Sequence, residues 1–154
     1  MPAFLNHSNH NKNVSFKVKD YMELSFPITG FETPIREAAS MIGDGLHEII
    51  VVMEKGIPKG FVSAADIISK VIALGSDPDE VKVRDVMTTS CPTISPDDDL
   101  MHASEIIRGG ANLLLVVKNN IFYGVITPST IALRFGEYAD KAVKDVIRNI
   151  SIFR

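Results

Sequence analysis

The chain carries one sequence pattern twice, and this internal repeat limits the possible folds more than any other feature. The pentad at residues 18–22 (VKDYM) returns 65 positions later at residues 83–87 (VRDVM). The same spacing relates three further pairs, which are Pro27 with Pro92, Ala38 with Ala103, and Ile42 with Ile107. The 154 residues are therefore expected to form two similar units that pack on each other.

The spacing between the copies changes by one residue. Residues 51–52 still match residues 116–117 at a spacing of 65, whereas Gly60 matches Gly124 at a spacing of 64. We place the lost residue in the turn after Lys55, because turns tolerate deletions better than strands do.

Each copy predicts the order strand, helix, strand, strand, helix from its apolar periodicity. In the first copy we expect a strand at 25–29, a helix opened by Thr33 and Pro34, strands at 48–53 and 60–63, and a helix at 64–74. In the second copy we expect a strand at 91–95, a helix opened at 95–98, strands at 113–117 and 122–127, and a helix at 129–135. A hydroxyl N-cap before proline opens the first helix of each copy.

The repeat and its flanks predict the organisation of the chain. The expected parts are a flexible N-terminal tail at 1–13, a first repeat at 14–74, a linker at 75–82, a second repeat at 83–135 and a C-terminal amphipathic helix at 136–154. The apolar stripe of that last helix needs a partner surface. The expected fold class is α/β, in the broad sense that includes α+β, because each repeat is predicted to mix helices and strands.

The two copies differ at a corner where a strand runs into a helix. Residues 60–66 (GFVSAAD) correspond to residues 124–130 (GVITPST). The third residue after the glycine carries a hydroxyl in both copies and is expected at the N-cap, beside unpaired backbone N–H groups. Three residues later the first copy has Asp66 and the second has Thr130. Such a corner can hold a polar ligand.

Composition excludes several function classes. The formal net charge of −3 and the absence of tryptophan argue against a nucleic-acid partner. The single cysteine, Cys91, cannot form an internal disulfide and is expected as a small apolar residue in a strand. The apolar runs at 49–53 and 113–117 are too short to cross a bilayer, so we expect no membrane partner. Without a signal sequence, a cytoplasmic location is expected.

These motifs, taken in order, resemble a tandem pair of CBS domains, the Bateman module. Each unit has a Met followed four or five residues later by a Pro, and ends in the pattern Gly-hydrophobic-x-Ser/Thr-x-x-Asp, with Thr130 in place of the Asp in the second unit. Residues 83–88 and 92–97 resemble the family closely, and the resemblance covers about residues 14–135. It implies two β-α-β-β-α units packed pseudo-symmetrically through their sheets, two clefts between them, and a homodimer.

The resemblance also implies a regulatory function. It predicts a stand-alone energy sensor that binds AMP, ADP, ATP or S-adenosylmethionine and requires no cofactor. Carried onto matching positions, Ser63 would lie near the phosphate or ribose, and Asp66 would accept from both ribose hydroxyls, as a carboxylate can from a cis-diol. The adenine slot is expected at Phe26, Ile28 and Phe61. The remaining candidate contacts are Pro27, His47, Lys59, Thr127 and Thr130.

Thr130 departs from the family pattern, because a neutral hydroxyl replaces the carboxylate. Hydrogen bonds to charged groups are roughly twice as strong as neutral ones, so we expect one competent site built on Asp66 and a second that is weak, empty or repurposed. Asp66 can also serve only as an acidic residue in the first turn of a helix. Two alternatives remain. One is a dimerisation or scaffold module that binds no ligand. The other is a small enzyme acting on a nucleotide, which the sequence does not favour because it offers no activated nucleophile, metal cluster or base–nucleophile pair.

Overall fold

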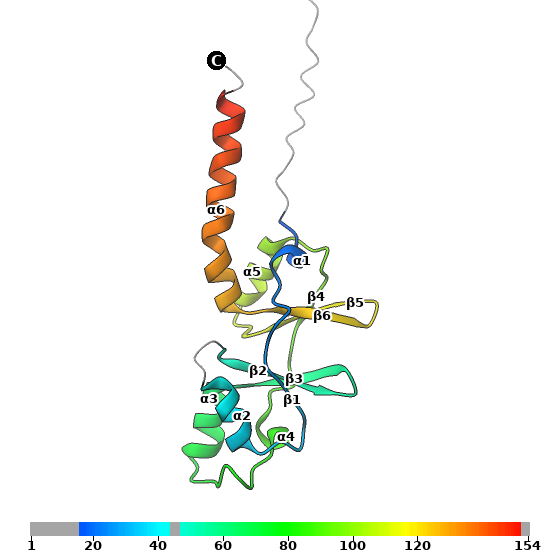
Figure 1. Cartoon of the computed structure of the whole chain (residues 1–154), viewed down its shortest axis with the longest axis vertical. Coiled ribbons are helices and arrows are strands. Elements are labelled where there is room, and N and C mark those ends of the chain that lie inside the picture. The colour runs from blue at the N-terminus through cyan, green and yellow to red at the C-terminus, as the bar shows by residue number, and fades with distance from the viewer. Residues whose placement is uncertain (1–15, 44–46, 152–154) are drawn as a thin grey trace, which may run out of the picture.

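The computed structural model describes residues 16–43 and 47–151. It contains two three-stranded sheets, which Figure 1 shows one above the other along the long axis. The elements of the first half are α1 (Val18–Tyr21), β1 (Ile28–Thr29), α2 (Ile35–Ile42), β2 (Ile49–Glu54), β3 (Ile57–Ser63), α3 (Ala64–Ile67) and the π-helix η1 (Ile68–Ile72). Those of the second half are α4 (Val83–Val86), β4 (Thr93–Ile94), α5 (Leu100–Arg108), β5 (Leu114–Lys118), β6 (Ile121–Ile126) and α6 (Pro128–Ser151). The predicted tail at 1–13 lies outside the described residues.

The two sheets have the same topology, which confirms the predicted α/β class. In each, the first strand runs parallel to the second, and the second pairs antiparallel with the third. The first strands are shorter than predicted, because Pro27 and Pro92 have no N–H to extend the ladder. Two-residue turns with positive φ, at Lys55–Gly56 and at residues 119–120, close the hairpins as type I′ turns do.

Strand register corrects the predicted position of the lost residue. Val52 pairs with Gly60 in the first sheet and Val116 pairs with Gly124 in the second, so the spacing is already 64 within the second strand of each sheet. Both hairpins are closed by two residues, and both carry a register shift at the equivalent place. The deletion therefore lies between helix and strand, between residues 42 and 49. Adjacent valines made the two alignments indistinguishable in the sequence.

The pentad that opens each repeat packs in the core of the other repeat. Val18 of α1 is fully buried among second-half side chains that include Ile94 and Leu114. Val83 of α4 is fully buried in the first-half core, against Ile35 and other apolar side chains. Backbone hydrogen bonds fix both positions, since Val18 N donates to Asp98 O at 2.9 Å and Val83 N donates to Thr33 O at 2.9 Å. The sequence repeats therefore do not coincide with the two packed cores.

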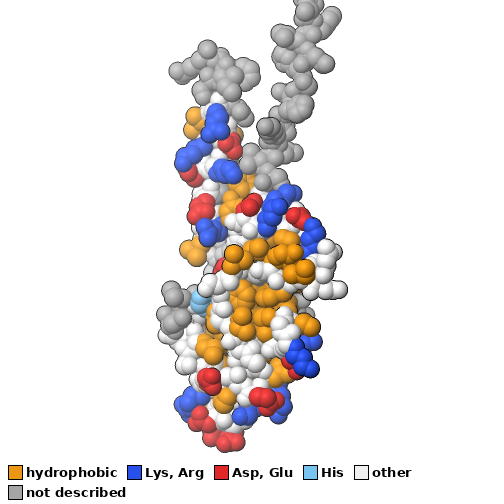
Figure 2. All heavy atoms as spheres, turned by 45° about the vertical axis from the view of Figure 1, so that its right-hand side comes forward, with side chains coloured by type: hydrophobic (Ala, Val, Ile, Leu, Met, Phe, Trp, Pro, Cys, Tyr) orange, Lys and Arg blue, Asp and Glu red, His pale blue; other side chains and the backbone are white. Residues whose placement is uncertain are grey.

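A third apolar cluster joins the inner faces of the two sheets. It consists of Val51, Phe61, Leu113, Leu115 and Val125, all at most 5% exposed. Figure 2 shows hydrophobic side chains gathered where the two halves meet. Cys91 packs against this cluster outside any strand, and its burial raises the pKa of the thiol. The predicted packing of the units through their sheets is confirmed.

The first long helix of each half begins later than predicted. Helix α2 begins at Ile35 after Pro34 at the N-cap, and no hydroxyl side chain caps it. Helix α5 begins at Leu100, and the side chain of Asp99 accepts from Met101 N at 2.8 Å. Asp99 is therefore the N-cap in place of the expected Ser95. A carboxylate is suited to this position because it accepts a free N–H group and complements the helix dipole.

Helix α6 is continuous where two helices were predicted. It runs from Pro128 to Ser151, through the boundary expected after Phe135. A single glycine, Gly136, disfavours a helix by only about 1 kcal/mol, and no proline follows. Ion pairs one turn apart support the helix, with Arg134 3.2 Å from Glu137 and Lys144 2.6 Å from Asp140. Figure 1 shows the C-terminal part of α6 projecting beyond the two sheets.

Candidate functional site

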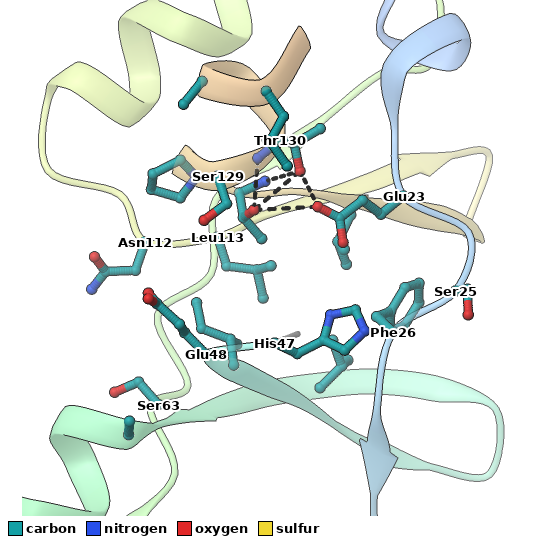
Figure 3. Close-up of a pocket in the computed structure, with 18 of the residues that line it drawn as sticks. Glu23, Ser25, Phe26, His47, Glu48, Ser63, Asn112, Leu113, Ser129 and Thr130 are labelled. Atoms are coloured by element: carbon teal, nitrogen blue, oxygen red, sulfur yellow. Dashed lines mark hydrogen bonds between the residues drawn. The ribbon is translucent and has the colours of Figure 1, made fainter. Parts of the chain in front are cut away.

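A cavity of about 920 Å³ lies between the two halves, where β3 and β6 end and α3 and α6 begin. Its apolar wall includes Phe26, Ile49, Leu113 and Val125, and its polar wall includes Glu23, His47, Glu48, Ser63, Thr130 and Arg134. Figure 3 shows Glu23 and Thr130 on one side and Ser63 on the other, with Glu48 and His47 between them. The cavity thus combines an apolar slot with hydroxyl, carboxylate and guanidinium groups, which suits a small polar ligand with an apolar part.

The first corner is a complete capping box. Ser63 Oγ accepts from Asp66 N at 3.1 Å, while Asp66 Oδ2 accepts from Ser63 N at 3.0 Å and from Ser63 Oγ at 2.9 Å. Thr88 Oγ1, from the segment after α4, lies 3.4 Å from the same Oδ2 atom. One oxygen of Asp66 is therefore surrounded by donors of the chain itself.

Lys70 occupies the other oxygen of Asp66. Its Nζ lies 2.9 Å from Asp66 Oδ1 and donates to Val86 O at 2.9 Å. The Asp66 side chain is 13% exposed. Burial alone would raise its pKa, but the hydrogen bonds from Lys70 and Ser63 outweigh burial and hold the pKa of Asp66 below its ordinary value. The carboxylate is thus ionised and internally paired.

The second corner repeats the capping geometry with two threonines. Thr130 N donates to Thr127 Oγ1 at 3.2 Å, and Thr127 N donates to Thr130 Oγ1 at 3.2 Å. Thr130 is 3% exposed, yet it lines the cavity. Its hydroxyl donates to Glu23 Oε1, and Thr127 Oγ1 lies 3.4 Å from the same oxygen. The dashed lines in Figure 3 mark this cluster.

Glu23 reaches this corner because its backbone is paired with β6. Glu23 N donates to Val125 O at 2.8 Å, and Val125 N donates to Glu23 O at 3.1 Å. Its Oε1 atom accepts from the two threonines, while Oε2 has no hydrogen bond or ion pair with any described residue. The second corner thus presents a partly buried carboxylate with one available oxygen in the cavity wall.

The structure separates the sequence-predicted residues into two groups. Those that line the cavity are Phe26, His47, Ser63, Thr127 and Thr130, and their ligand contacts stay predictions. Those outside its lining are Pro27, Ile28, Lys59, Phe61 and Asp66. Phe61 is buried between the sheets, Ile28 is 50% exposed, and Lys59 is an exposed residue of β3. Pro27 uses its carbonyl to accept from Val51 N at 3.0 Å.

Sequence reasoning missed Glu23, Glu48 and Asn112 as lining residues. Glu23 lies just after the first pentad, 104 residues from Thr127 in the chain. The repeat alignment places Glu23 opposite Thr88, and this pairing was the available signal. This correspondence could be interpreted only once the structure showed that the segment opening each repeat packs against the other half.

The described residues contain no group of three or more His, Cys, Asp or Glu side chains placed to hold a metal ion. Nor do the helices in that part of the chain combine the length and apolar character needed to cross a membrane. The acidic residues 97–99 form ion pairs and a helix cap. Asp97 pairs with Lys118 and Lys19, and Asp99 caps α5.

Known proteins are similar to this chain in sequence or in fold. The chain is 27% identical to the CBS domain-containing protein YhcV of Bacillus subtilis, over 87% of this chain and 94% of that protein. It is 31% identical to an uncharacterized protein of Methanopyrus kandleri over 62% of this chain, a match that spans only 50% of that relative. A hexameric CBS-CP12 protein from bloom-forming cyanobacteria has a similar fold, with a TM-score of 0.68 and 18% identity, over 89% of this chain and 83% of that one.

The family assignment covers both repeats. The CBS domain family matches residues 18–73 and again residues 83–137, which together make up most of the chain. These ranges bracket the two crossing pentads, the two sheets and the two corners described above. The protein therefore belongs to the CBS-domain family and carries two CBS domains in tandem.

Proposed function

We propose that this protein is a regulatory module that binds an adenosine-containing ligand, such as AMP, ADP, ATP or S-adenosylmethionine, in the cavity between its repeats. The observation that carries the proposal is the cavity itself, of about 920 Å³. An apolar slot lined by Phe26, Leu113 and Val125 suits a purine ring, and the hydroxyl and carboxylate groups of the corners suit a ribose. Arg134, on the same wall, suits a phosphate.

Helix α6 offers a route from ligand to response. Its first turn carries Thr130 in the cavity wall, and its later turns expose Val143, Val146, Ile147 and Ile150, each more than half exposed. A ligand that favours one orientation of this helix over another shifts the population of that orientation without any covalent chemistry. The proposed output is therefore a change of shape or assembly, and no enzymatic activity is proposed.

We further propose that the exposed stripe on α6 forms a homodimer interface. Apolar stripes of this kind are usually covered by a partner. Replacing both Val146 and Ile150 by glutamate should convert a dimer into a monomer in sedimentation velocity runs. The matched control is Leu74→Glu, which changes an apolar side chain that is 72% exposed and lies outside α6. If the double glutamate variant has the same sedimentation coefficient as the wild-type protein and the control, a dimer through this helix is contradicted.

A thermal-shift panel tests ligand binding, with AMP, ADP, ATP, NAD, S-adenosylmethionine and GMP as ligands. A ligand present at about one hundred times its Kd stabilises the folded state by about 2.7 kcal/mol, which raises the Tm by about 5 °C or more. A shift with adenosine compounds and none with GMP is the expected result. A flat panel would instead favour the scaffold function, and turnover of ATP or AMP detected by chromatography would indicate an enzyme.

A further inference from the structure

The carboxylate and the hydroxyl have exchanged positions between the two corners. In the first corner, helix residue Asp66 carries the carboxylate and crossing residue Thr88 carries the hydroxyl. In the second corner, helix residue Thr130 carries the hydroxyl and crossing residue Glu23 carries the carboxylate. Thr88 and Glu23 occupy equivalent places, since Thr88 pairs with Phe61 as Glu23 pairs with Val125. The second repeat therefore lacks the helix carboxylate, yet its corner retains one.

The exchange changes what each carboxylate is free to do. Asp66 is fixed by the capping box and by Lys70, with donors of the chain on both oxygens, and it does not line the cavity. Glu23 is held through Oε1 alone, and it lines the cavity. The counterpart of Lys70 is Arg134, which pairs with Glu137 at 3.2 Å instead of with the corner carboxylate. Glu23 thus remains an acceptor without a cationic partner among the described residues.

We propose that Glu23 accepts the vicinal ribose hydroxyls of the ligand, so that the site is organised on the second corner and not on Asp66. This assignment rests on the proposed function. A carboxylate held in place by Thr130 is a preorganised acceptor, and it can take hydrogen bonds from both hydroxyls of a cis-diol. Its position, opposite Ser63 and Glu48 in Figure 3, leaves the apolar wall between them for the base.

Calorimetric titrations with AMP, 2′-deoxy-AMP and 3′-deoxy-AMP test the assignment. The wild-type protein should prefer AMP over each deoxy analogue by about tenfold or more, because each analogue lacks one donor to a charged acceptor. Glu23→Gln, which keeps the shape but not the charge, should lose most of this preference. Asp66→Asn is the rival variant, and Glu80→Gln, an exposed residue outside the cavity lining, controls for net charge.

The outcomes separate the two proposals. If no adenosine compound binds the wild-type protein, the proposed function is wrong and the assignment of Glu23 falls with it. If AMP binds but Glu23→Gln still prefers it while Asp66→Asn does not, the proposed function stands and the assignment is overturned. Circular dichroism checks that each variant is folded. If Glu23→Gln is unfolded, Glu23→Asp replaces it, because aspartate keeps the charge but has a shorter side chain. Glu23→Asp should also lose the preference for AMP over the deoxy analogues, and an unchanged preference would overturn the assignment.

A stability cycle tests the exchange without any ligand. Thr130→Asp brings a second carboxylate against Glu23 and should lower the Tm by several degrees at pH 7, because like charges repel at this distance. Adding Glu23→Thr reproduces the carboxylate–hydroxyl pair of the first corner and should restore most of the loss. A double variant no more stable than Thr130→Asp alone would show that the two positions are not complementary, which would contradict the argument that Thr130 holds Glu23 in place.

Discussion

The carbonyl oxygen of Thr88 lies so close to Gly60 that a Cβ on Gly60 would be 2.3 Å from it. Gly124 meets the carbonyl oxygen of Glu23 in the same way, at 2.5 Å. Both glycines therefore serve the crossing segments, because only a residue without a side chain allows the incoming backbone to pair with the strand. This contact explains why the repeated motif begins with glycine.

Gly60→Ala should destabilise the protein by about 1–3 kcal/mol. The new methyl would meet the backbone of Thr88, which cannot move without breaking its two hydrogen bonds to Phe61. Denaturant unfolding measures the change. The control is Gly136→Ala in α6, where nothing lies within 4 Å of the new Cβ and the helix should gain about 0.5–1 kcal/mol. Equal stability of Gly60→Ala and the wild-type protein would contradict the close-approach argument.

Val83→Ala should destabilise the first half of the protein, although Val83 lies in the second sequence repeat. The side chain is fully buried in the core that contains Ile35 and Ile50, and removing two methyl groups there costs about 2 kcal/mol. Hydrogen exchange should show reduced protection in β2 before any change in β5. Arg84→Ala, at an exposed neighbouring position, should leave both strands protected. Loss of protection confined to β5 would contradict the crossed packing.

Asp66→Asn should reduce the loss of folding stability that the protein shows as the pH falls through the acidic range. The pKa of Asp66 is lower in the folded state, so its ionised form stabilises the fold above the unfolded pKa of about 3.9. This contribution declines as the pH falls through 3.9 and is lost below the folded pKa. The stability difference between wild type and Asp66→Asn should thus be constant at pH 5–7 and shrink below about pH 4. A difference that grows on acidification would contradict this sign.

Thr29→Val should stabilise the protein by about 1 kcal/mol. Thr29 is 6% exposed, and its hydroxyl has no hydrogen-bond partner among the described residues. The equivalent position in the second sheet is the buried, apolar Ile94. Thermal unfolding measures the gain, and Ile94→Thr is the mirror variant, expected to destabilise. A lower Tm for Thr29→Val would show that the hydroxyl has a partner, such as an ordered water.

If the proposed function is correct, Arg134→Gln should weaken the binding of AMP by about tenfold and leave the binding of adenosine almost unchanged. Arg134 lines the cavity, and its pair with Glu137 is exposed and contributes little to stability. Lys144→Gln is the matched control, because it breaks a similar pair on α6 outside the cavity lining. Equal weakening of AMP and adenosine would place the phosphate away from Arg134.

Local patterns were sufficient for the elements of the fold. Buried runs such as residues 49–53 predict strands, and the repeated motif predicts two equal units, because both signals depend on neighbouring residues. Errors arose where distant contacts decide the outcome. The extent of the first strands, the start of α5 at Leu100 and the continuity of α6 depend on pairing partners and caps that short windows do not contain.

The candidate site shows the same division. From the repeat alone, Ser63, Thr127 and Thr130 were recognised as residues of a strand-to-helix corner, since a hydroxyl N-cap has a local signature. Glu23 was not recognised, because it belongs to the other corner by sequence and reaches Thr130 only through the crossing of the opening segments.

By itself, then, the sequence determined two β-α-β-β-α units, their family and their corner motifs, all of which depend on spacing along the chain. Only the tertiary structure decided that each pentad completes the core of the other repeat and that Asp66 is paired with Lys70. It also decided that Glu23 brings a carboxylate to the second corner. The physical reason is that side chains far apart in the chain meet only when strand pairing and core packing bring their backbones together.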